Sequence, residues 1–552
     1  MSAECLVRNI FEPKFANIFR FNSFSNLQMI LLPSLLSDDA NMVVNSPTGS
    51  GKTCLFELAI IRIINKSEHD SLMIYIAPTK GIIQEKVRDW SQKFGPFGVN
   101  IVEMTGDVEG VKFEHLSSST IILTTPDKFE IVSRSFLQLQ ALLEKIKLLM
   151  IDEIHFLGED VSRGYKLETL IIRMKLIQKK FDLKFRIIGC SATLQNACDI
   201  GRWLNCKPEN VHKFDETFRP VPLYISTISF GSGASNPFLF DKVLDSKVWE
   251  VYRKFNPNPN NNQTLVFCHS KANTEKLAHK FSEICHFDNR DELFNNNNNN
   301  LFNSINLAKL VNCGLAYHHS GLGFDDRQLV ESLFIQGKIR VLFSTTTLAY
   351  GVNLPAFLII VKGTKCWRDG AYKSLSRIEV SQMVGRAGRK GLDDSGVAVI
   401  MTSNEEKFAY ANLSKEIEVI DSNLEKHLIE SIGCEITLKI IKSLDDCVDW
   451  LQQSFFAVML KKNSAVSSSS SSSDELIREF CERIINKLLD NNFLTYNTGT
   501  TFFRETYANN IMTRNLLCFE SVLKIINISS PCTMYNLLSC ISNCSEMARP
   551  LR

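Results

Sequence analysis

The stretch from Asn45 to Thr53 reads NSPTGSGKT and follows a short apolar run, Met42 to Val44. A helix-like apolar pattern, Leu55 to Ile64, comes directly after it. A strand, a glycine-rich turn ending in Gly-Lys-Thr and a helix are the arrangement of a phosphate-binding P-loop. The backbone N–H groups of such a turn face phosphate oxygens, and the helix adds the positive end of its dipole. A glycine- and serine-rich turn formed by chance is disfavoured, because both flanking elements are in the expected places.

The residue types of this stretch suit the phosphates of a nucleotide. Lys52 supplies a charge for the β and γ phosphates, and the Thr53 hydroxyl can ligate Mg²⁺. Gly49 and Gly51 allow a close approach of phosphate that a side chain would obstruct. The predicted phosphate-binding residues are therefore Ser46, Pro47, Thr48, Gly49, Ser50, Gly51, Lys52 and Thr53.

Length and composition limit what else the chain can be. With 552 residues it is too long for a single hydrophobic core, so we expect three or four domains. An apolar fraction of 44% and a charged fraction of 22% are typical of a globular protein. The net charge of +2 excludes a polycation that coats nucleic acid, so any nucleic-acid site must be local.

The cysteines and the apolar runs bear on the compartment. The 16 cysteines include no Cys-x-x-Cys pair, and the cluster of Cys532, Cys540 and Cys544 has helical rather than metal-ligand spacing. Reduced, buried thiols of an intracellular protein explain them best. The N-terminal stretch lacks the apolar core of a signal peptide, and no uncharged run is long enough to cross a membrane. The sequence therefore predicts a soluble intracellular protein.

After the P-loop, apolar runs that predict buried parallel strands alternate with helical patterns. Each run is followed by a polar motif, at the strand end where open α/β sheets bind ligands. The runs are Met73–Ala77, Thr120–Thr124, Leu148–Ile151 and Arg186–Cys190, and the motifs after them are PTK at 78–80, TPD at 125–127, DEIH at 152–155 and SAT at 191–193.

The DEIH motif carries the clearest chemistry of these. Asp152 can hold Mg²⁺ through water, and Glu153 can orient and deprotonate an attacking water. Adjacent acids are also common in turns, but a strand end 100 residues after Lys52 favours the catalytic interpretation. His155 is placed to link this loop to the Ser191 loop by hydrogen bonding, although a lone histidine is more often structural.

Residues 206–262 contain Pro-, Gly- and Asn-rich stretches and are predicted to connect two domains. The last motif after them, QMVGRAGR at 382–389, is helix-like, and Arg386 and Arg389 would share a helical face. A guanidinium can neutralise charge on a transferring phosphoryl group. A surface arginine pair is the simpler interpretation of the motif alone. A second series of strand-like runs begins after the connector and predicts a second α/β domain, which has no P-loop of its own. The runs are Thr264–Cys268, Lys338–Ser344, Phe357–Val361 and Val397–Met401, and the last of them follows the QMVGRAGR motif.

Beyond residue 405 helical patterns dominate. A hairpin pattern at 493–503 follows several helices, so a winged-helix module is predicted there. A further helix from Met512, including Leu516 and Val522, begins another domain. The tracts Asn295–Asn300 and Ser467–Ser473 cannot bury a core and are predicted to be disordered insertions. The predicted helices are Leu424–Ile432, Glu435–Leu444, Val448–Leu460 and Leu476–Asp490.

The ordered set of motifs resembles the two-RecA-domain core of the superfamily-2 helicases, in the Ski-like branch. The set consists of Gln28, the P-loop, PTK, TPD, DEIH, SAT, the strand end at 265–270, STTTLAYGVNLPA at 344–356 and QMVGRAGR. Within the branch, NLAKLVNCGLAYHHSG at 306–321 and the run from 345 to 356 look most like the meiotic crossover DNA helicases. FRPVPL at 218–223 leans towards the spliceosomal RNA helicases.

The resemblance implies a role for each matching position. Gln28 would read adenine, for which a carboxamide offers a donor and an acceptor, and Gly351 would lie near the nucleotide. Arg386 and Arg389 would reach across from the second domain as arginine fingers. His155, Ser191 and Thr193 would couple the two loops. The phosphates of a bound strand would contact, without reading its sequence, Thr79, Lys80, Thr125, Ser270 and Thr345.

The resemblance also implies the architecture: an α/β fold with two tandem RecA-like, doubly wound parallel-sheet domains at 1–205 and 263–415, a winged-helix domain at 416–510 and the start of a truncated helical ratchet-type domain at 511–552. The segment Gly363–Ser381 lies where relatives carry a strand-separating hairpin, with Trp367 or Tyr372 as its wedge. An ordinary surface loop with an exposed aromatic is the alternative. Ser46 replaces the Ala or Gly usual in relatives.

The expected function is that of an ATP-dependent 3′–5′ DNA helicase that uses ATP and Mg²⁺ to move on single-stranded or branched DNA, in meiotic recombination and in the nucleus. We expect a monomeric motor without membrane contact; recombination proteins as partners are not derivable from the residues. Two alternatives stay open. One is an RNA helicase of the spliceosomal or exosome-associated type, because the core grips backbone. The other is an ATP-dependent clamp or scaffold without unwinding, which a shortened C-terminal domain permits.

Overall fold

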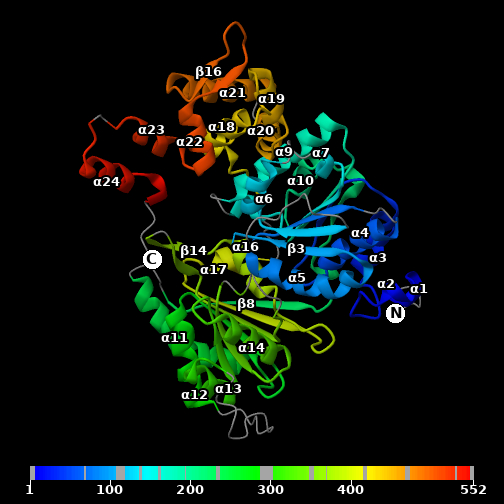
Figure 1. Cartoon of the computed structure of the whole chain (residues 1–552). Helices are drawn as coiled ribbons and strands as arrows, with labels where there is room; N and C mark the ends of the chain where they lie inside the picture. The colour runs from blue at the N-terminus through cyan, green and yellow to red at the C-terminus, as the bar shows by residue number, and fades with distance from the viewer. Residues whose placement is uncertain are drawn as a thin grey trace.

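The computed structural model consists of three parts: two α/β domains and a helical C-terminal region (Figure 1). The predicted tracts Asn295–Asn300 and 467–472 lie outside the residues that it describes. Those residues are 6–66, 70–106, 119–135, 140–159, 163–192, 194–231, 236–285, 302–346, 348, 354–368, 370–413, 419–466, 473–528 and 531–547.

The first domain is built on a parallel sheet of seven strands in the order β3-β4-β2-β5-β6-β1-β7. Neighbouring residues of one strand enter different cores: Met42 and Val44 pack in one, Val43 in the other. Because both faces are buried, the strands read as continuous apolar runs. The strands are β1 (Met42–Asn45), β2 (Leu72–Ile76), β3 (Asn100–Met104), β4 (Thr120–Thr124), β5 (Ile146–Ile151), β6 (Arg186–Ser191) and β7 (Val211–Lys213).

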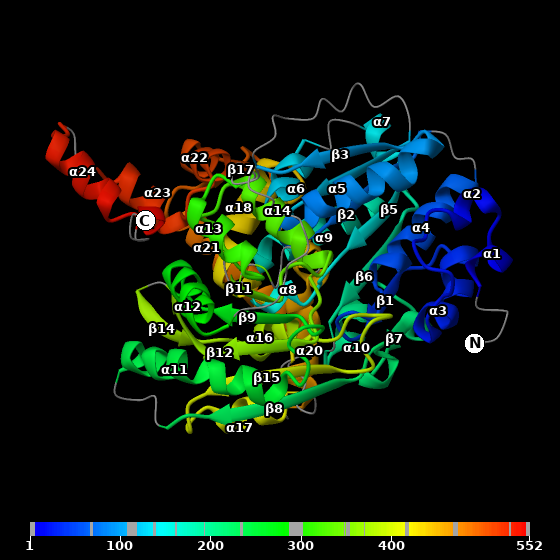
Figure 2. The same ribbon diagram turned by 90° about the horizontal axis from the view of Figure 1, so that it is seen from below.

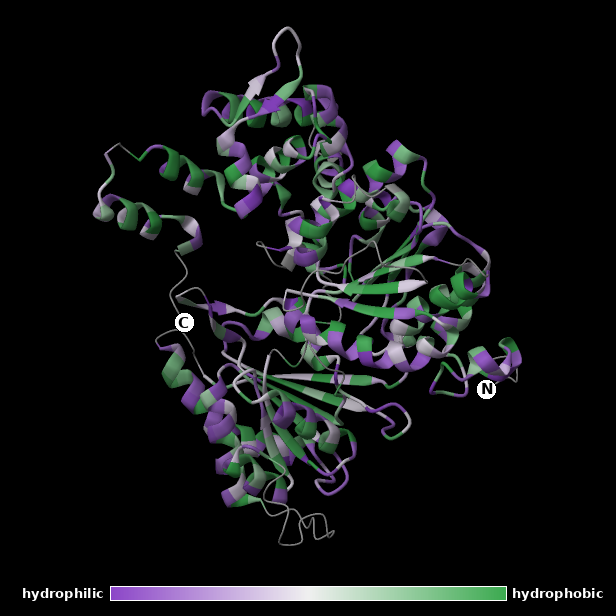
Figure 3. Ribbon diagram, in the orientation of Figure 1, coloured by the Kyte–Doolittle hydropathy of each residue, from purple (hydrophilic) through white to green (hydrophobic). Residues whose placement is uncertain are grey.

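Helices cover both faces of this sheet. One core contains residues of α3 (Asn26–Ser37), α4 (Thr53–Asn65) and α5 (Lys80–Phe94). The other contains residues of α6 (Pro126–Ser133), α9 (Gly164–Phe181) and α10 (Ala197–Trp203). Figure 3 shows the hydrophobic strands between the helices, whose outer parts are more hydrophilic. The shorter helices are α1 (Val7–Ile10), α2 (Pro13–Ala16), α7 (Gln140–Leu143) and α8 (Phe156–Glu159).

The second domain repeats this plan with a parallel sheet of six strands in the order β10-β11-β9-β12-β15-β8. Figure 2 shows the strands of the two sheets as two separate groups. The prediction of two parallel-sheet α/β domains is thus confirmed. The strands are β8 (Leu223–Ser229), β9 (Thr264–Cys268), β10 (Leu315–His318), β11 (Val341–Thr345), β12 (Leu358–Lys362) and β15 (Gly396–Thr402), and the helices are α11 (Pro237–Phe255), α12 (Lys271–Ile284), α13 (Ile305–Asn312), α14 (Phe324–Ile335), α16 (Arg377–Val384) and α17 (Lys407–Ala411).

The predicted connector, residues 206–262, instead contributes to both domains. β7 pairs with β1 at the edge of the first sheet, and β8 pairs with β15 at the edge of the second. Helix α11 packs on the second sheet, and only residues 214–222 lie between β7 and β8. Inside the predicted connector, Asn236 caps α11 and Pro237 occupies its first turn, so this Asn-Pro pair starts a helix.

The C-terminal region is mainly helical, but three of its predicted helices are interrupted in the structure. The predicted helix Glu435–Leu444 is interrupted where Lys439 adopts a left-handed backbone with φ 60°. The predicted helix through Leu516 is interrupted in the same way, with φ 55° at that residue. The predicted helix Val448–Leu460 is divided at Gln453 and Ser454. The helices are α18 (Leu428–Thr437), α19 (Leu444–Gln452), α20 (Phe455–Val466), α21 (Ser473–Asp490), α22 (Tyr507–Asn515), α23 (Phe519–Ile526) and α24 (Met534–Ser542).

A two-stranded antiparallel hairpin follows α21, where the wing of a winged-helix module is expected. It consists of β16 (Leu494–Tyr496) and β17 (Phe503–Glu505). The predicted domain boundary at residue 510 lies inside α22, which packs against α18 and contributes Met512 to the same core. The boundary is therefore wrong: the core of this region extends through α23.

The C-terminal helices lie against the first domain, on the side away from the second domain (Figure 1). Arg173 of α9 is fully buried there and binds Glu435 of α18 and Glu130 of α6, with Nη2–Oε1 distances of 2.5 and 3.0 Å. Glu168 of α9 accepts a hydrogen bond from the backbone N–H of Phe456 at 2.8 Å. No helix in the described ranges combines the length and apolarity needed to cross a membrane.

Candidate nucleotide and nucleic-acid site

The P-loop joins β1 to α4 at the carboxyl edge of the first sheet. Gly49 and Gly51 have φ values of 81° and 93°, which L side chains rarely adopt. The Lys52 ammonium donates to the backbone carbonyls of Ser46 and Pro47 at 3.1 and 3.2 Å. The loop thus binds this ammonium through its own backbone carbonyls. We expect a bound phosphate to take the place of these carbonyls.

The remaining loop residues support this arrangement. The hydroxyls of Ser46 and Ser50 lie 3.0 Å apart and share a hydrogen bond in the interior, so the serine that departs from relatives has a partner. Thr53 is the first residue of α4, where its hydroxyl lies at the helix N-terminus. A Cβ on Gly385 of the second domain would approach the Thr48 side chain at 2.7 Å, so the loop directly contacts the arginine motif.

The acidic pair lies at the end of β5. The Tyr75 hydroxyl donates to Asp152 Oδ2 at 2.6 Å, and the backbone N–H of Glu153 donates to Oδ1 at 3.0 Å. Burial and then the Glu153 charge raise the pKa of Asp152, whereas the bond from Tyr75 opposes that rise. A divalent cation would offset this cost, because positive charge favours a carboxylate. Asp152 and Thr53 therefore fit a role as Mg²⁺ ligands in their chemistry.

Glu153 has a left-handed backbone, with φ 50°, which is unusual for a non-glycine residue. Its carboxylate lies 3.3 Å from His155 Nδ1. This conformation places two consecutive acids in different environments: Asp152 is held by Tyr75, and Glu153 faces the histidine.

His155 connects three motifs. Its Nδ1 lies 3.3 Å from the Ser191 hydroxyl, and its Nε2 lies 2.6 Å from the amide nitrogen of Gln382 in the second domain. Burial and then the Lys52 charge lower its pKa to about 3, so the ring is neutral at pH 7 and offers one donor and one acceptor. The backbone N–H of Ala192 also donates to Nδ1, at 3.4 Å, so both ring nitrogens have hydrogen-bond partners. Thr193, the third predicted coupling residue, lies outside the described residues.

The two predicted arginine fingers differ in position. Helix α16 ends at Val384, and Gly388 has a φ of 90°, so Arg386 and Arg389 do not share a helical face as predicted. Arg386 is half-buried between the domains, where desolvation lowers its pKa and the charges of Glu85 and Glu153 raise it.

Arg389 is held within its own domain. Its guanidinium binds Asp393 at 2.7 Å and donates to Gln263 Oε1 at 3.1 Å. The structure thus brings Arg386, and not Arg389, to the first domain.

Arg219 is a functional candidate that the sequence analysis missed. Its guanidinium donates to the carbonyls of Gly385 at 2.8 Å and Ala387 at 2.6 Å, on either side of Arg386, and to the P-loop carbonyl of Thr48 at 3.3 Å. It lies in FRPVPL between β7 and β8. The sequence analysis used FRPVPL only to compare families. The position of an arginine between the two predicted domains was the signal that could have pointed to Arg219.

A cleft of about 1000 Å³ opens between the domains beside the P-loop. Gln28, predicted to read adenine, lines it but is 3% exposed. Its carboxamide accepts from the backbone N–H of Ser25 at 2.9 Å and donates to the Gly51 carbonyl at 3.3 Å. The side chain thus ties the start of α3 to the P-loop, and adenine reading stays a prediction. Gly351 lies outside the described residues.

The five residues predicted to contact a bound strand lie at carboxyl ends of strands or at the helices that follow. Thr79 and Ser270 cap α5 and α12, accepting backbone N–H groups at 3.4 and 3.1 Å. Lys80 begins α5, Thr125 precedes α6, and Thr345 ends β11. The N-termini of three helices therefore accompany these hydroxyls, and such termini bind phosphate. Contact with a strand stays a prediction.

The predicted hairpin segment is a hairpin. β13 (Lys365–Arg368) pairs antiparallel with β14 (Ala371–Ser374), and Trp367 faces Tyr372 across it. The two rings are 5.0 Å apart, and 62% of Trp367 and 39% of Tyr372 are exposed. This corrects the alternative of an irregular surface loop; a role as a wedge stays a prediction.

Comparison with known proteins agrees with this geometry. The model of the DEAD/DEAH box helicase family matches residues 25–200, and that of the helicase conserved C-terminal domain matches residues 247–391. The ATP-dependent DNA helicase MER3 of Saccharomyces cerevisiae is 34% identical over 99% of the chain and 46% of its own length. The probable ATP-dependent DNA helicase HFM1 of Mus musculus is 34% identical over 97% of the chain and 38% of its own length.

A splicing protein is also similar, over a shorter part of the chain. The U5 small nuclear ribonucleoprotein 200 kDa helicase of Caenorhabditis elegans is 33% identical over 80% of the chain and 21% of its own length. The chain spans about half or less of the length of each of these relatives. With these two helicase domain models matched in order on two parallel-sheet domains, the chain belongs to the helicases that have a DEAD/DEAH box domain followed by a helicase conserved C-terminal domain, and it is similar over nearly its whole length to the MER3 and HFM1 proteins.

Proposed function

We propose that the chain is the motor part of an ATP-dependent 3′–5′ DNA helicase that acts in meiotic recombination in the nucleus. The observation that carries this proposal is the divided site. Lys52 and the acidic pair belong to the first domain, and Arg386 reaches the same place from the second. The names of the MER3 and HFM1 relatives support DNA as the substrate and ATP as the fuel.

In the proposed hydrolysis each side chain has one task. The Lys52 ammonium leaves the backbone carbonyls of Ser46 and Pro47 and binds the β and γ phosphates of ATP. Glu153 takes the proton of the attacking water, and its neighbour His155, whose pKa is lowered to about 3, is too weak a base to compete. Mg²⁺ held by Thr53 and Asp152 would neutralise phosphate charge. Arg386 stabilises charge on the transferring phosphoryl group.

The proposed movement follows from contacts on both sides of the cleft. Bound ATP touches the P-loop and Arg386, so it favours the closed arrangement, and loss of the γ-phosphate removes that preference. His155–Gln382 and the Arg219 contacts link closure to the loops that touch phosphate. A single strand gripped along the carboxyl edges of both sheets would then move stepwise.

The first test is Lys52→Ala, assayed for ATP hydrolysis with and without single-stranded DNA. We expect activity to be abolished, because the charge that binds the phosphates is lost. The thermal unfolding curve should change little, because the ammonium holds only two carbonyls of the loop. Retention of DNA-stimulated hydrolysis in a folded variant contradicts the proposal.

A second candidate is an RNA helicase, which the similarity to the U5 ribonucleoprotein helicase favours. A 3′-tailed duplex made in DNA and RNA versions separates the two: displacement of the DNA duplex supports the first proposal, and displacement of RNA alone supports the second. ATP hydrolysis stimulated by DNA without any displacement indicates a clamp or scaffold instead.

A further inference from the structure

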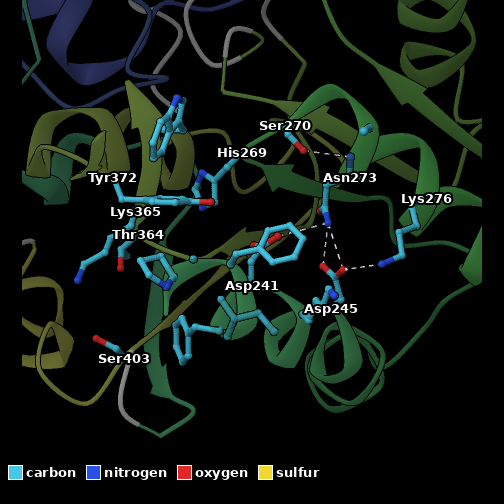
Figure 4. A pocket seen from close by; sticks show the side chains of 18 of the residues that line it. Asp241, Asp245, His269, Ser270, Asn273, Lys276, Thr364, Lys365, Tyr372 and Ser403 are labelled. Carbon is cyan, nitrogen blue, oxygen red and sulfur yellow. Dashed lines mark hydrogen bonds and ion pairs between the residues drawn. The ribbon is translucent and has the colours of Figure 1, made fainter. Parts of the chain in front are cut away.

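A second cavity lies on the second domain, away from the nucleotide cleft. It has a volume of about 390 Å³, at the small end of the roughly 300–1,000 Å³ of ligand pockets. The start of α11, the start of α12 and the β13–β14 hairpin form its walls. Figure 4 shows Asn273 and Lys276 bound to Asp245 on one side, and His269 and Tyr372 on the other. Ser270, Trp367 and Tyr372 line it and were given predicted roles above, but none of those roles uses the cavity itself.

Aromatic side chains surround the cavity and are open to solvent. Trp367 and Tyr372 come from the hairpin, and Phe238, which is 58% exposed, comes from the first turn of α11. Isolated exposed aromatics are common, but here three from two separate elements face one hollow. Aromatic platforms of this kind stack the bases of single strands.

The charges that line the cavity are balanced, with three lysines (Lys242, Lys276 and Lys365) and three carboxylates (Asp241, Asp245 and Glu406). Lys242 lies with its ammonium 4.7 Å from the centre of the Phe238 ring. The buried Lys362 lies behind this lining. Lys362 lies 2.8 Å from Asp241 and also binds Asp245. Lys276 is 3.5 Å from Asp245 and Lys365 is 3.7 Å from Glu406. A cationic ligand would have to displace an ammonium, and an anionic ligand would meet three carboxylates. The cavity therefore suits a neutral, flat group.

His269 is a polar side chain in the wall of the cavity. Both of its ring nitrogens are buried beside the backbone of Lys362 and Gly363. Burial and then the Lys362 charge lower its pKa to about 4, so the ring is neutral at pH 7. A neutral imidazole offers one donor and one acceptor, which is the chemistry of a base edge.

We propose that this cavity holds one nucleobase of a bound single strand, turned out between Trp367 and Phe238. Ser270 supplies the link to the strand, because it both lines the cavity and caps α12, whose N-terminus suits a phosphate. A nucleotide with its phosphate at that terminus has its base beside the cavity. This inference rests on the proposed function, since a strand must be bound before a base can enter.

The test uses single-stranded oligothymidylates that carry one 2-aminopurine, moved position by position along the strand. Because no duplex is present, a wedge action of the hairpin does not contribute. We expect one position to show a distinct change of fluorescence when the protein binds. Trp367→Ala and Phe238→Ala should remove that change and weaken binding roughly tenfold.

An abasic residue at the same position provides the decisive control. A strand without that base should bind the unaltered protein roughly tenfold more weakly, and neither substitution should weaken it further, because the base they would stack is missing. Tyr224→Ala, at an aromatic residue that is 64% exposed outside the cavity, should behave like the unaltered protein on every strand. Thermal unfolding of each variant checks its fold.

Other outcomes separate this inference from the proposed function. Tight binding with no distinct position, and equal affinity for the abasic strand, overturns the base cavity while the helicase proposal stands. Equal loss on normal and abasic strands assigns the aromatics to backbone contact or to a peptide partner and also overturns it. No binding of single-stranded DNA or RNA by the unaltered protein overturns both.

Discussion

The first domain contacts the second domain through hydrogen bonds of Arg219 and His155 and through Ile378 of α16, but it contacts the C-terminal helices through buried ion pairs and several apolar side chains. On the first side are His155–Gln382 and the bonds from Arg219. On the second side are Arg173 with its two glutamates and Phe455, which packs inside the first domain's own core.

The difference indicates which interface moves. Breaking a buried ion pair leaves unpaired charges and costs several kcal/mol, so such a pair suits a permanent contact. Hydrogen bonds to carbonyls can be exchanged for water at a small net cost. We infer that the first domain and the C-terminal helices move as one unit, against which the second domain opens and closes.

The strongest test of the moving interface is Arg386→Ala. We expect kcat for ATP hydrolysis to fall by about 10³-fold or more, with a smaller change of KM, because the guanidinium acts on charge formed in the transition state. Arg389→Ala is the matched control, since Asp393 holds that side chain within its own domain. A larger loss in the Arg389 variant would mean that hydrolysis needs a different closure of the domains.

The fixed interface is tested by Arg173→Ala. Glu435 and Glu130 would stay buried without their cation, so we expect the free energy of unfolding to fall by about 3–5 kcal/mol. Chemical denaturation followed by fluorescence measures it. Arg202→Ala breaks a pair in which the arginine is 68% exposed and should cost less than about 1 kcal/mol. Similar losses in both variants would argue against a fixed unit.

The same interface should depend on pH through Glu168. Burial, as the main cause, raises its pKa to about 7, above the ordinary value of about 4.5 expected in the unfolded chain, although bonds from Phe456 and Ser422 oppose the rise. Between these values the folded state binds more protons, so stability falls as pH rises from about 4.5 to 7 and is level above that. The shift corresponds to about 3 kcal/mol.

Glu168→Gln removes this titration. The unaltered protein should therefore lose thermal stability relative to the variant between pH 5 and pH 8. A difference in melting temperature that is constant over this range would show that Glu168 stays ionised in the folded protein.

Sequence patterns predicted the interior of both sheets and missed their edges. The nine interior strands are buried on both faces and read as apolar runs, whereas the four missed strands, β3, β7, β8 and β10, are the edge strands of the two sheets. β3 and β8 are mostly half-exposed, and β7 has three residues, so none of these three gives a long buried run. β10 is buried but has only four residues, two of them Tyr317 and His318.

The residues of the site also fall into two groups, those that the sequence predicted and those that it missed. The P-loop and DEIH motifs are local, and their residues follow from neighbouring sequence. The partners Tyr75, Gln382 and Arg219 lie far along the chain from the groups they bind, so spacing does not reveal them. The shared face of Arg386 and Arg389 was wrong because Gly388 takes a conformation that ends the helical pattern.

Arg219 offers the test with the smallest expected effect on the moving interface, because its guanidinium joins both domains only through hydrogen bonds to carbonyls. Substitution by alanine removes bonds to Thr48, Gly385 and Ala387 at once. We expect a tenfold to hundredfold lower kcat for ATP hydrolysis, about the value of a hydrogen bond from a charged donor. Arg219→Lys keeps the charge but not the planar fork, so it should restore little.

A merely structural role of Arg219 would lower the melting temperature of the variant and leave kcat per folded molecule unchanged. If Arg219→Lys instead restores full activity, the charge rather than the three-way hydrogen bonding matters, and closure is not transmitted through these carbonyls.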